Sequence, residues 1–145
     1  MDQKGFTMVE LLLVLSVFVI LFGIVGSISR NTLPSTQVKV EGDAVEEVLR
    51  KAQARTVSRH GDLVWGVHIA TTSVTLFAGP SYAARTAAYD ELRAFPSAIT
   101  ASGLADVIFQ FRTGATSNTG TITLTHVLTG DSNTLTVNAT GSVDQ

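Results

Sequence analysis

The sequence predicts an α+β fold, in which a long N-terminal hydrophobic helix leads to a head with one helix packed on a mainly antiparallel β-sheet. Three observations carry this prediction. The chain begins with a long apolar run, apolar side chains recur at helical spacing after residue 42, and strand-like alternation follows Gly61. We expect residues 30–42 to be a stalk or linker and residues 43–145 to form the head.

Composition excludes several classes of protein. At 145 residues the chain has the length of about one domain. Its content of 45% hydrophobic and 15% charged residues excludes a disordered, highly charged chain. The absence of cysteine from the sequence excludes disulfide scaffolds, thiolate zinc sites, iron–sulfur clusters and cysteine nucleophiles. The net charge of -2 argues against a protein built mainly to bind nucleic acid.

The apolar run near the N-terminus is long enough for a membrane-spanning helix. Residues 11–29 carry no charge, and the stretch from Phe6 to Ile28 carries only that of Glu10. As a helix this stretch would be about 34 Å long, against about 30 Å for the hydrocarbon core of a bilayer. It is apolar on every side, unlike a helix on a protein surface. We therefore predict a transmembrane helix over residues 6–29.

A cleaved secretory signal peptide and a plain membrane anchor each fit this run less well. A signal peptide has an apolar stretch of about 7–15 residues and small residues at its cleavage site. The run is longer than that, and residues 28–31 match such a site poorly. A plain membrane anchor leaves Glu10 without a role, because a carboxylate inside a spanning segment costs about 2.5–3.5 kcal/mol on insertion scales.

A specific pattern precedes the apolar run. A short polar leader containing Lys4 ends in Gly5, Phe6 follows, and Glu10 comes five residues after the glycine. This pattern resembles the leader of type IV pilins and type II secretion pseudopilins. The resemblance implies that a prepilin peptidase removes residues 1–5 by cutting between Gly5 and Phe6 on the cytoplasmic side of the membrane. It also implies N-methylation of the new amino terminus at Phe6.

The same resemblance implies a role for Glu10 in assembly. In a filament its carboxylate would meet the charged amino terminus at Phe6 of a neighbouring subunit. Breaking a desolvated ion pair costs about 3–5 kcal/mol, so the pair would favour the correct helix register. The implied partners are other pilin or pseudopilin subunits, the prepilin peptidase and an inner-membrane assembly platform. The implied location is the bacterial inner membrane, in a single pass with the head outside the cytoplasm, and later a periplasmic or cell-surface filament.

A second helix is expected from about residue 43 to residue 60. Its apolar stripe recurs at helical spacing, at Val45, Val48, Leu49 and Ala52. Pro34 is expected to break or kink the chain before this helix. Gly42 is expected to lie at its start, and Gly61 to follow its last turn as the C′ residue.

After this helix the sequence predicts five or six short strands, mostly antiparallel, with the helix covering one side of the sheet. Apolar and polar residues alternate over 63–69, 74–78, 107–111, 122–124 and 135–137. The segments 71–73 and 130–133 are expected to be turns, and residues 80–97 to be irregular.

The head carries a resemblance of its own. The segment 52–61, followed by a strand with Trp65, resembles the GspH/FimT type of minor pseudopilin and minor pilin. Its late strands are matched by residues 108–114, 120–124 and 135–143. The resemblance implies a structural subunit of a type IV pilus or type II secretion pseudopilus, acting in initiation or at the tip. The chain departs from the family in lacking cysteines and in having no lysine or arginine after Arg112. The alternative is a DNA-binding minor pilin for natural transformation, which a tail without basic residues disfavours.

No group of residues predicts an enzyme, a metal site or a cofactor. His60, His68 and His126 fall on separate predicted segments, whereas a catalytic or zinc site needs groups that converge. Asp90-Glu91 is an adjacent pair with no predicted cleft, and residues 131–133 lack the full ligand spacing of a calcium loop.

The long loop contains the residue types of a nucleic-acid contact. Tyr82, Arg85, Tyr89 and Arg93 have the composition of a surface that stacks bases and binds phosphates. Their spacing of three to four residues is explained more simply by a short amphipathic helix. Nucleic acid is therefore not expected as a partner.

Overall fold

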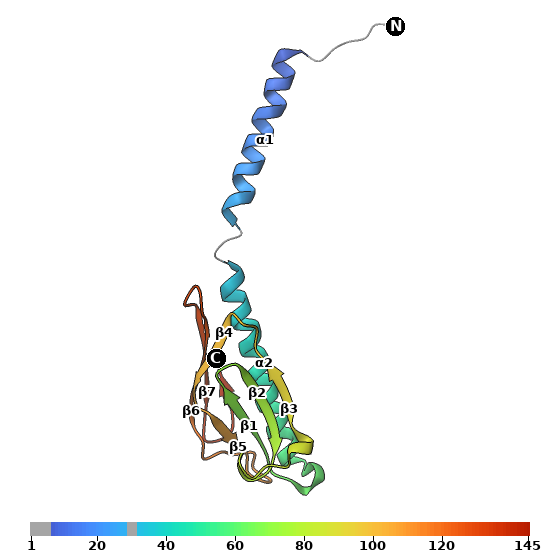
Figure 1. Ribbon diagram of the computed structural model, residues 1–145, viewed down its shortest axis with the longest axis vertical. Helices are drawn as coiled ribbons and strands as arrows, with labels where there is room; N and C mark the ends of the chain where they lie inside the picture. Colours follow the sequence, from blue (N-terminus) through green and yellow to red (C-terminus); the bar gives the residue numbers. More distant parts are fainter. Residues whose placement is uncertain (1–6, 29–31) are drawn as a thin grey trace, which may run out of the picture. The chain divides into compact units, whose positions relative to one another are not determined.

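The structure of the protein, a computed structural model, describes residues 7–28 and 32–145, and for 23–28 and 32–33 it describes the backbone alone. The chain divides into two compact units, Met1–Leu33 and Pro34–Gln145. Two long helices come first, α1 (Met8–Ile28) and α2 (Thr32–Val57) (Figure 1). The remaining elements are η1 (His60–Asp62), β1 (Trp65–Ala70), β2 (Ser73–Ala78), η2 (Ala87–Tyr89), β3 (Glu91–Ala94), β4 (Ile99–Gly103), β5 (Asp106–Ile108), β6 (Gly120–His126), β7 (Ser132–Val137) and β8 (Val143–Asp144).

The described strands form two four-stranded sheets. Sheet A has the order β3-β2-β1-β5, and sheet B has the order β4-β6-β7-β8. Every pairing within them is antiparallel, as predicted. The prediction of one sheet is wrong, because β4 belongs to sheet B, β5 to sheet A and β6 to sheet B again. The chain thus crosses between the sheets repeatedly in this region.

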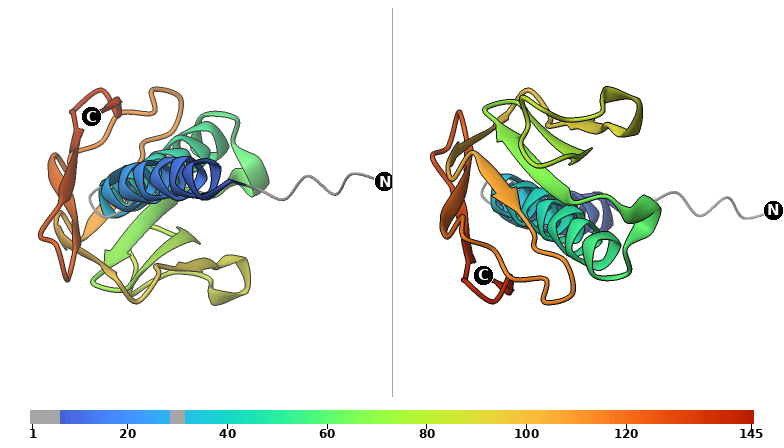
Figure 2. Two further views of the ribbon diagram at one scale, coloured as in Figure 1. Left: turned by 90° about the horizontal axis from the view of Figure 1, so that it is seen from above. Right: turned by 90° about the horizontal axis from the view of Figure 1, so that it is seen from below.

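Helix α2 packs against the inner faces of both sheets. Viewed nearly along the helix, the green strands of sheet A and the orange and red strands of sheet B flank it on different sides (Figure 2). Val45, Leu49 and Ala52 on this helix have no exposed surface. They share one core with residues of both sheets, among them Val67, Leu76, Ile122, Leu124 and Leu135. Full burial of one large aliphatic side chain is worth roughly 1.5–3 kcal/mol, so α2 holds the two sheets together.

The second helix begins earlier than predicted. It starts at Thr32 rather than near residue 43, so the segment expected to precede it is helical from residue 32 onward. Pro34 lies in the first turn, where a missing N–H breaks no intrahelical hydrogen bond. Val38 is 1% exposed and lies one heptad before Val45, so it extends the apolar stripe toward the helix start.

Gly42 lies inside α2, not at its start, and a side chain of sheet B lies close to it. A Cβ at this position would collide with the side-chain amide nitrogen of Asn133 on β7 and lie 3.8 Å from Leu124 on β6. The amide nitrogen of Asn133 is buried and has no hydrogen-bond partner among the described residues. The glycine therefore leaves room for the Asn133 side chain beside the helix.

The C-terminal end of α2 also differs from the prediction. The helix ends at Val57, and Gly61, at φ 68°, lies within the following 3-10 turn and is not the C′ residue. The Thr56 hydroxyl donates to the Ala52 carbonyl oxygen (3.0 Å) and accepts the backbone N–H of Trp65 (3.0 Å). This buried hydroxyl thus links the last turn of α2 to Trp65, the first residue of β1. The helix ends before residue 60, and the chain returns so that β1 lies next to this turn.

Strand bounds differ from the prediction chiefly where the apolar alternation is weak. Residues 80–97, expected to be irregular, contain β3, and the expected amphipathic helix is reduced to the three residues of η2. The sequence pattern also predicts neither β4 nor β8. Residues 71–72 form the turn before β2, as predicted, but β7 already begins at Ser132, inside the expected turn.

Gly42→Ala tests the close approach of α2 to sheet B. In an ordinary helix interior this change stabilises by about 1 kcal/mol. Here the added methyl group must displace the end of the Asn133 side chain, so we expect Gly42→Ala to gain less than about 1 kcal/mol in the free energy of unfolding. Urea denaturation of the single and double variants with Asn133→Ala measures the coupling. The gain should be larger without the Asn133 side chain, and equal gains with and without it would contradict the proposed contact.

Candidate functional site

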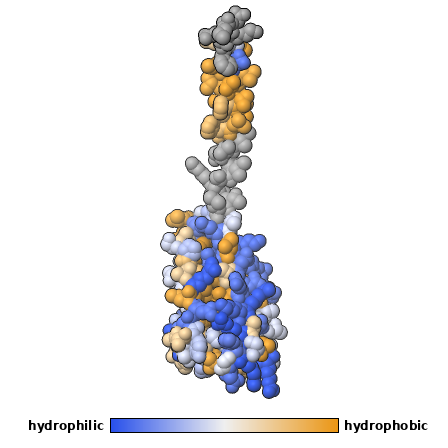
Figure 3. Space-filling model, turned by 90° about the vertical axis from the view of Figure 1, so that its right-hand side faces the viewer, coloured by the Kyte–Doolittle hydropathy of each residue, from blue (hydrophilic) through white to orange (hydrophobic). Residues whose placement is uncertain are grey.

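The described side chains of α1, those of residues 8–22, are apolar except for Glu10 and Ser16. Its large apolar side chains from Met8 to Phe22 are all between 46% and 83% exposed. In the space-filling view the visible side of this segment is almost entirely hydrophobic (Figure 3). Soluble monomers rarely expose a continuous apolar surface of this kind, which is typical of an interaction surface.

Glu10 lies exposed in the first turn of α1, and Thr7 caps that turn. The Thr7 hydroxyl accepts the backbone N–H of Glu10 (3.3 Å), and the Thr7 carbonyl oxygen accepts that of Leu11 (3.2 Å). A threonine followed three residues later by glutamate is the signature of a capping box. A carboxylate in this turn is also favoured by the helix dipole. The sequence reasoning missed this role, although the Thr-x-x-Glu spacing shows it.

The other predicted N-terminal site residues, Gly5 and Phe6, lie outside the described residues. Of the transmembrane helix predicted over 6–29, the structure describes a helix from Met8 to Ile28, which is α1. Across residues 7–28 and 32–145, no helix is found that is both long enough and apolar enough to cross a membrane.

The three histidines have separate surroundings. His60 lies in η1 and accepts the indole N–H of Trp65 at its carbonyl oxygen (3.1 Å). His68 on β1 bonds Asp106 through Nδ1 (2.8 Å), and the buried His126 on β6 accepts the backbone N–H of Thr129 (3.3 Å). Within the described ranges, no group of three or more histidine, aspartate or glutamate side chains could hold a metal ion.

Tyr82 and Arg85 pack on the outer face of sheet A. Phe77 is fully buried there above Gly66, and its ring makes a T-shaped contact with that of Tyr82, with the ring centroids 5.5 Å apart. The rings of His68 and Tyr82 stack at 3.8 Å, and the guanidinium of Arg85 lies 3.9 Å from the Tyr82 centroid. Each of these side chains is therefore engaged in covering the sheet.

The four residues with the composition of a nucleic-acid surface lie in separate contacts. Tyr82 and Arg85 belong to the stack just described. Tyr89 meets the edge of Trp65 at 6.1 Å, and Arg93 bonds Glu41 at 3.0 Å. The structure thus distributes these side chains over three different contacts.

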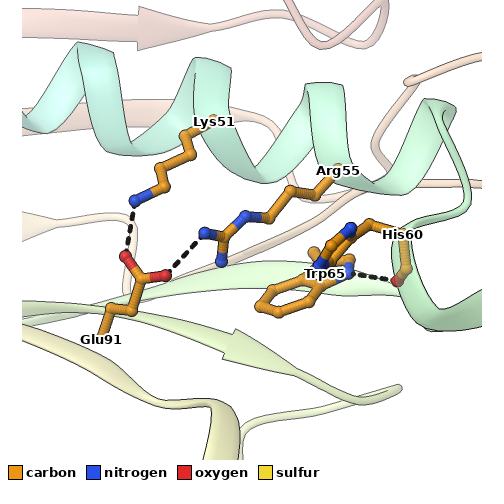
Figure 4. Close-up of polar contacts among 5 residues, drawn as sticks. All are labelled: Lys51, Arg55, His60, Trp65 and Glu91. Carbon is orange, nitrogen blue, oxygen red and sulfur yellow. Dashed lines mark hydrogen bonds and ion pairs between the residues drawn. The ribbon is translucent and has the colours of Figure 1, made fainter.

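Asp90 and Glu91 do not act together. Asp90 bonds Arg85 (2.7 Å), and this hydrogen bond is the main cause of the raised pKa of the guanidinium. The Glu91 carboxylate lies between Lys51 (2.6 Å) and Arg55 (2.7 Å) of α2 (Figure 4). The hydrogen bond from Lys51, assisted by Arg55, lowers the pKa of Glu91.

The Glu91 cluster joins β3 to the centre of the head. The guanidinium of Arg55 also lies 4.6 Å from the ring centroid of Trp65, between Glu91 and that indole (Figure 4). At the other end of β3, Arg93 bonds Glu41 of α2. Ion pairs from Glu91 and Arg93 therefore hold this edge strand against α2, which is a structural role.

Comparison with known proteins bears on the N-terminal segment. A family model described as the prokaryotic N-terminal methylation motif matches residues 1–26. Residues 1–26 carry a type IV pilin-like prepilin signal. This signal contains the predicted cleavage and methylation residues, Glu10 and most of α1, and it indicates a type IV pilin-like or pseudopilin subunit, a structural class of protein. No curated protein and no solved structure matches the chain. Membership of the GspH/FimT family stays a prediction.

Glu91→Gln tests the ionic attachment of β3. Because the pKa of Glu91 is lowered, its ion pairs stabilise the fold above the ordinary glutamate pKa of about 4.3 and are lost as the pH falls through the lowered value. The variant should be less stable than the wild type at neutral pH and lose less stability between about pH 5 and pH 3. Thermal melting across this range measures both effects.

The matched control is Glu47→Gln on α2, a glutamate that forms no ion pair among the described residues. Its stability should follow the wild-type dependence on pH. Parallel pH profiles for the wild type and Glu91→Gln would rule out the ionic attachment.

Proposed function

We propose that the protein is a minor pilin or pseudopilin that assembles through α1 into a type IV pilus or type II secretion pseudopilus, in initiation or at the tip. The match of residues 1–26 to the methylation motif carries this proposal. The exposed apolar side chains of α1 support it, because a filament core of packed helices would bury them. The head would supply lateral contacts. Its resemblance to the GspH/FimT type is the ground for the minor-subunit role.

The proposal assigns roles to three residues of the N-terminal segment. A prepilin peptidase cuts between Gly5 and Phe6, and Phe6 becomes the methylated amino terminus. Glu10 then pairs with that terminus on a neighbouring subunit. Thr7 would remain the helix cap after the cut, so the new amino group would lie one residue before the cap of α1. A carboxylate beside this first turn would offset both the positive charge of that amino group and the positive end of the helix dipole.

The proposed setting follows from these roles. The precursor lies in the inner membrane in a single pass with its head outside the cytoplasm, and the mature chain enters a periplasmic or cell-surface filament. Its partners are other pilin or pseudopilin subunits, the prepilin peptidase and the inner-membrane assembly platform. The DNA-binding alternative is not favoured, because Tyr82, Arg85, Tyr89 and Arg93 are divided among separate contacts.

Intact-mass measurement tests entry into the pilin pathway. The protein is isolated from membranes of cells with and without prepilin peptidase. We expect loss of residues 1–5 and gain of one methyl group only where the peptidase is present. An unprocessed chain, or one cut near residues 27–31, would exclude the proposed processing.

Glu10→Gln tests the assembly role separately from processing. The amide keeps the size of the side chain and leaves the Thr7 cap intact, but it removes the charge that pairs with the amino terminus. Breaking such a desolvated pair costs about 3–5 kcal/mol, so the mature variant should stay in the membrane and be depleted from sheared filaments. Glu10→Asp, which keeps the charge, is the control. Equal incorporation of Glu10→Gln and wild type would remove the pairing from the proposal.

A further inference from the structure

Strand β3 leaves one edge of sheet A unpaired. It is the outermost strand in the order β3-β2-β1-β5, and all four of its residues are exposed. Leu92, at its centre, is 70% exposed. Natural proteins usually protect such an edge, because its free N–H and C=O groups can pair with another strand. Among the described residues, α2 contacts β3 through charged side chains, and no strand pairs with its outer edge.

The register shows which backbone groups point outward. The N–H of Phe95 donates to the carbonyl oxygen of Thr72, directly opposite, at 2.9 Å. Hydrogen-bonded pairs alternate along an antiparallel ladder, so Arg93 and Glu91 bond β2 and the residues between them do not. The N–H and C=O groups of Leu92 and Ala94 therefore point away from the sheet.

The sequence of this edge is complementary to itself. In an antiparallel pair of two β3 strands centred on Leu92, the two leucines would form a hydrogen-bonded pair. Glu91 of each copy would then lie opposite Arg93 of the other, on the same face. Opposite charges at directly opposed positions stabilise a strand pair, and like charges destabilise it. We infer that the edge of β3 is a docking surface for a second copy of this chain, through a two-fold pairing of Glu91-Leu92-Arg93.

The space beside the edge fits this occupant. A groove of about 190 Å³ runs between β3 and α2, with Val48 and Leu76 among its apolar lining. Glu47 and Lys51 of the helix and Glu91 and Arg93 of the strand also line it, so its rim alternates in charge. Arg93 of a second copy would enter next to Glu91 and Glu47. The side of the head shown in Figure 3 is mainly hydrophilic, with small hydrophobic areas.

Disulfide trapping of the full chain in detergent tests this pairing. The natural sequence has no cysteine, so Leu92→Cys can form only an intermolecular disulfide. Opposed residues of a hydrogen-bonded antiparallel pair have Cα atoms about 5.5 Å apart, within the range of a disulfide. Under mild oxidation we expect several-fold more covalent dimer for Leu92→Cys than for Leu128→Cys. The control residue is a leucine 86% exposed in the turn after β6, so its cysteine reports collisions and association through α1 alone.

A second change separates pairing of the strand edges from simple proximity. Ala94→Pro, added to Leu92→Cys, removes an outward N–H without breaking the ladder to β2, and edge strands tolerate proline. Circular dichroism melting confirms that each variant is folded. We expect Ala94→Pro to reduce the dimer toward the level of the Leu128→Cys control. Equal crosslinking at positions 92 and 128, or crosslinking unaffected by the proline, would overturn the inference. Because the readout needs neither cleavage nor filaments, failure of the proposed function leaves this test intact.

Discussion

The whole head depends on one helix face shared between two sheets. Val45, Leu49 and Ala52 of α2 are fully buried, and the core that they join includes Val67 of sheet A and Ile122 of sheet B. Without the helix, the inner face of each sheet would lose its main apolar cover. Gly42 leaves room beside this helix for Asn133 of sheet B, and the ion pairs of β3 hold the edge of sheet A against it.

Much of this fold could be predicted from apolar periodicity. The errors occur where tertiary packing or ion pairs, and not the apolar pattern, determine the structure. The helix and the strands around Val67, Leu76, Ile122 and Leu135 carry strong alternation and were found. The start of α2 was missed because Pro34 and Gly42 suggested a break, yet Val38 stands one heptad before Val45 and continues the stripe. Strand β3 was missed because ion pairs hold its charged residues, and a single sequence does not show which charges will meet.

The N-terminal site was the part most accessible to sequence reasoning, since a short local pattern defines it. Gly5, Phe6 and Glu10 were singled out because their order and spacing resemble a prepilin leader; the methylation motif spans all three positions, and their individual roles stay predictions. The capping role of Thr7 follows from an equally local pattern, the Thr-x-x-Glu spacing. Contacts in the head were less accessible. Nothing in the spacing of Tyr82 and Arg85 shows that one would stack on His68 and the other bond Asp90.

The order of strands along the chain has a consequence for folding. Sheet A takes its last strand, β5, from between two strands of sheet B, so neither sheet is formed by one continuous stretch of chain. Strand β4 pairs with β6, whose residues lie some twenty positions later. To form such a pairing, the chain must first close the loop between the two strands, and the entropy lost in doing so slows folding. Strands β1 to β3 follow one another and can pair in turn, whereas β4 must wait for β6 and sheet B is complete only when β8 is available.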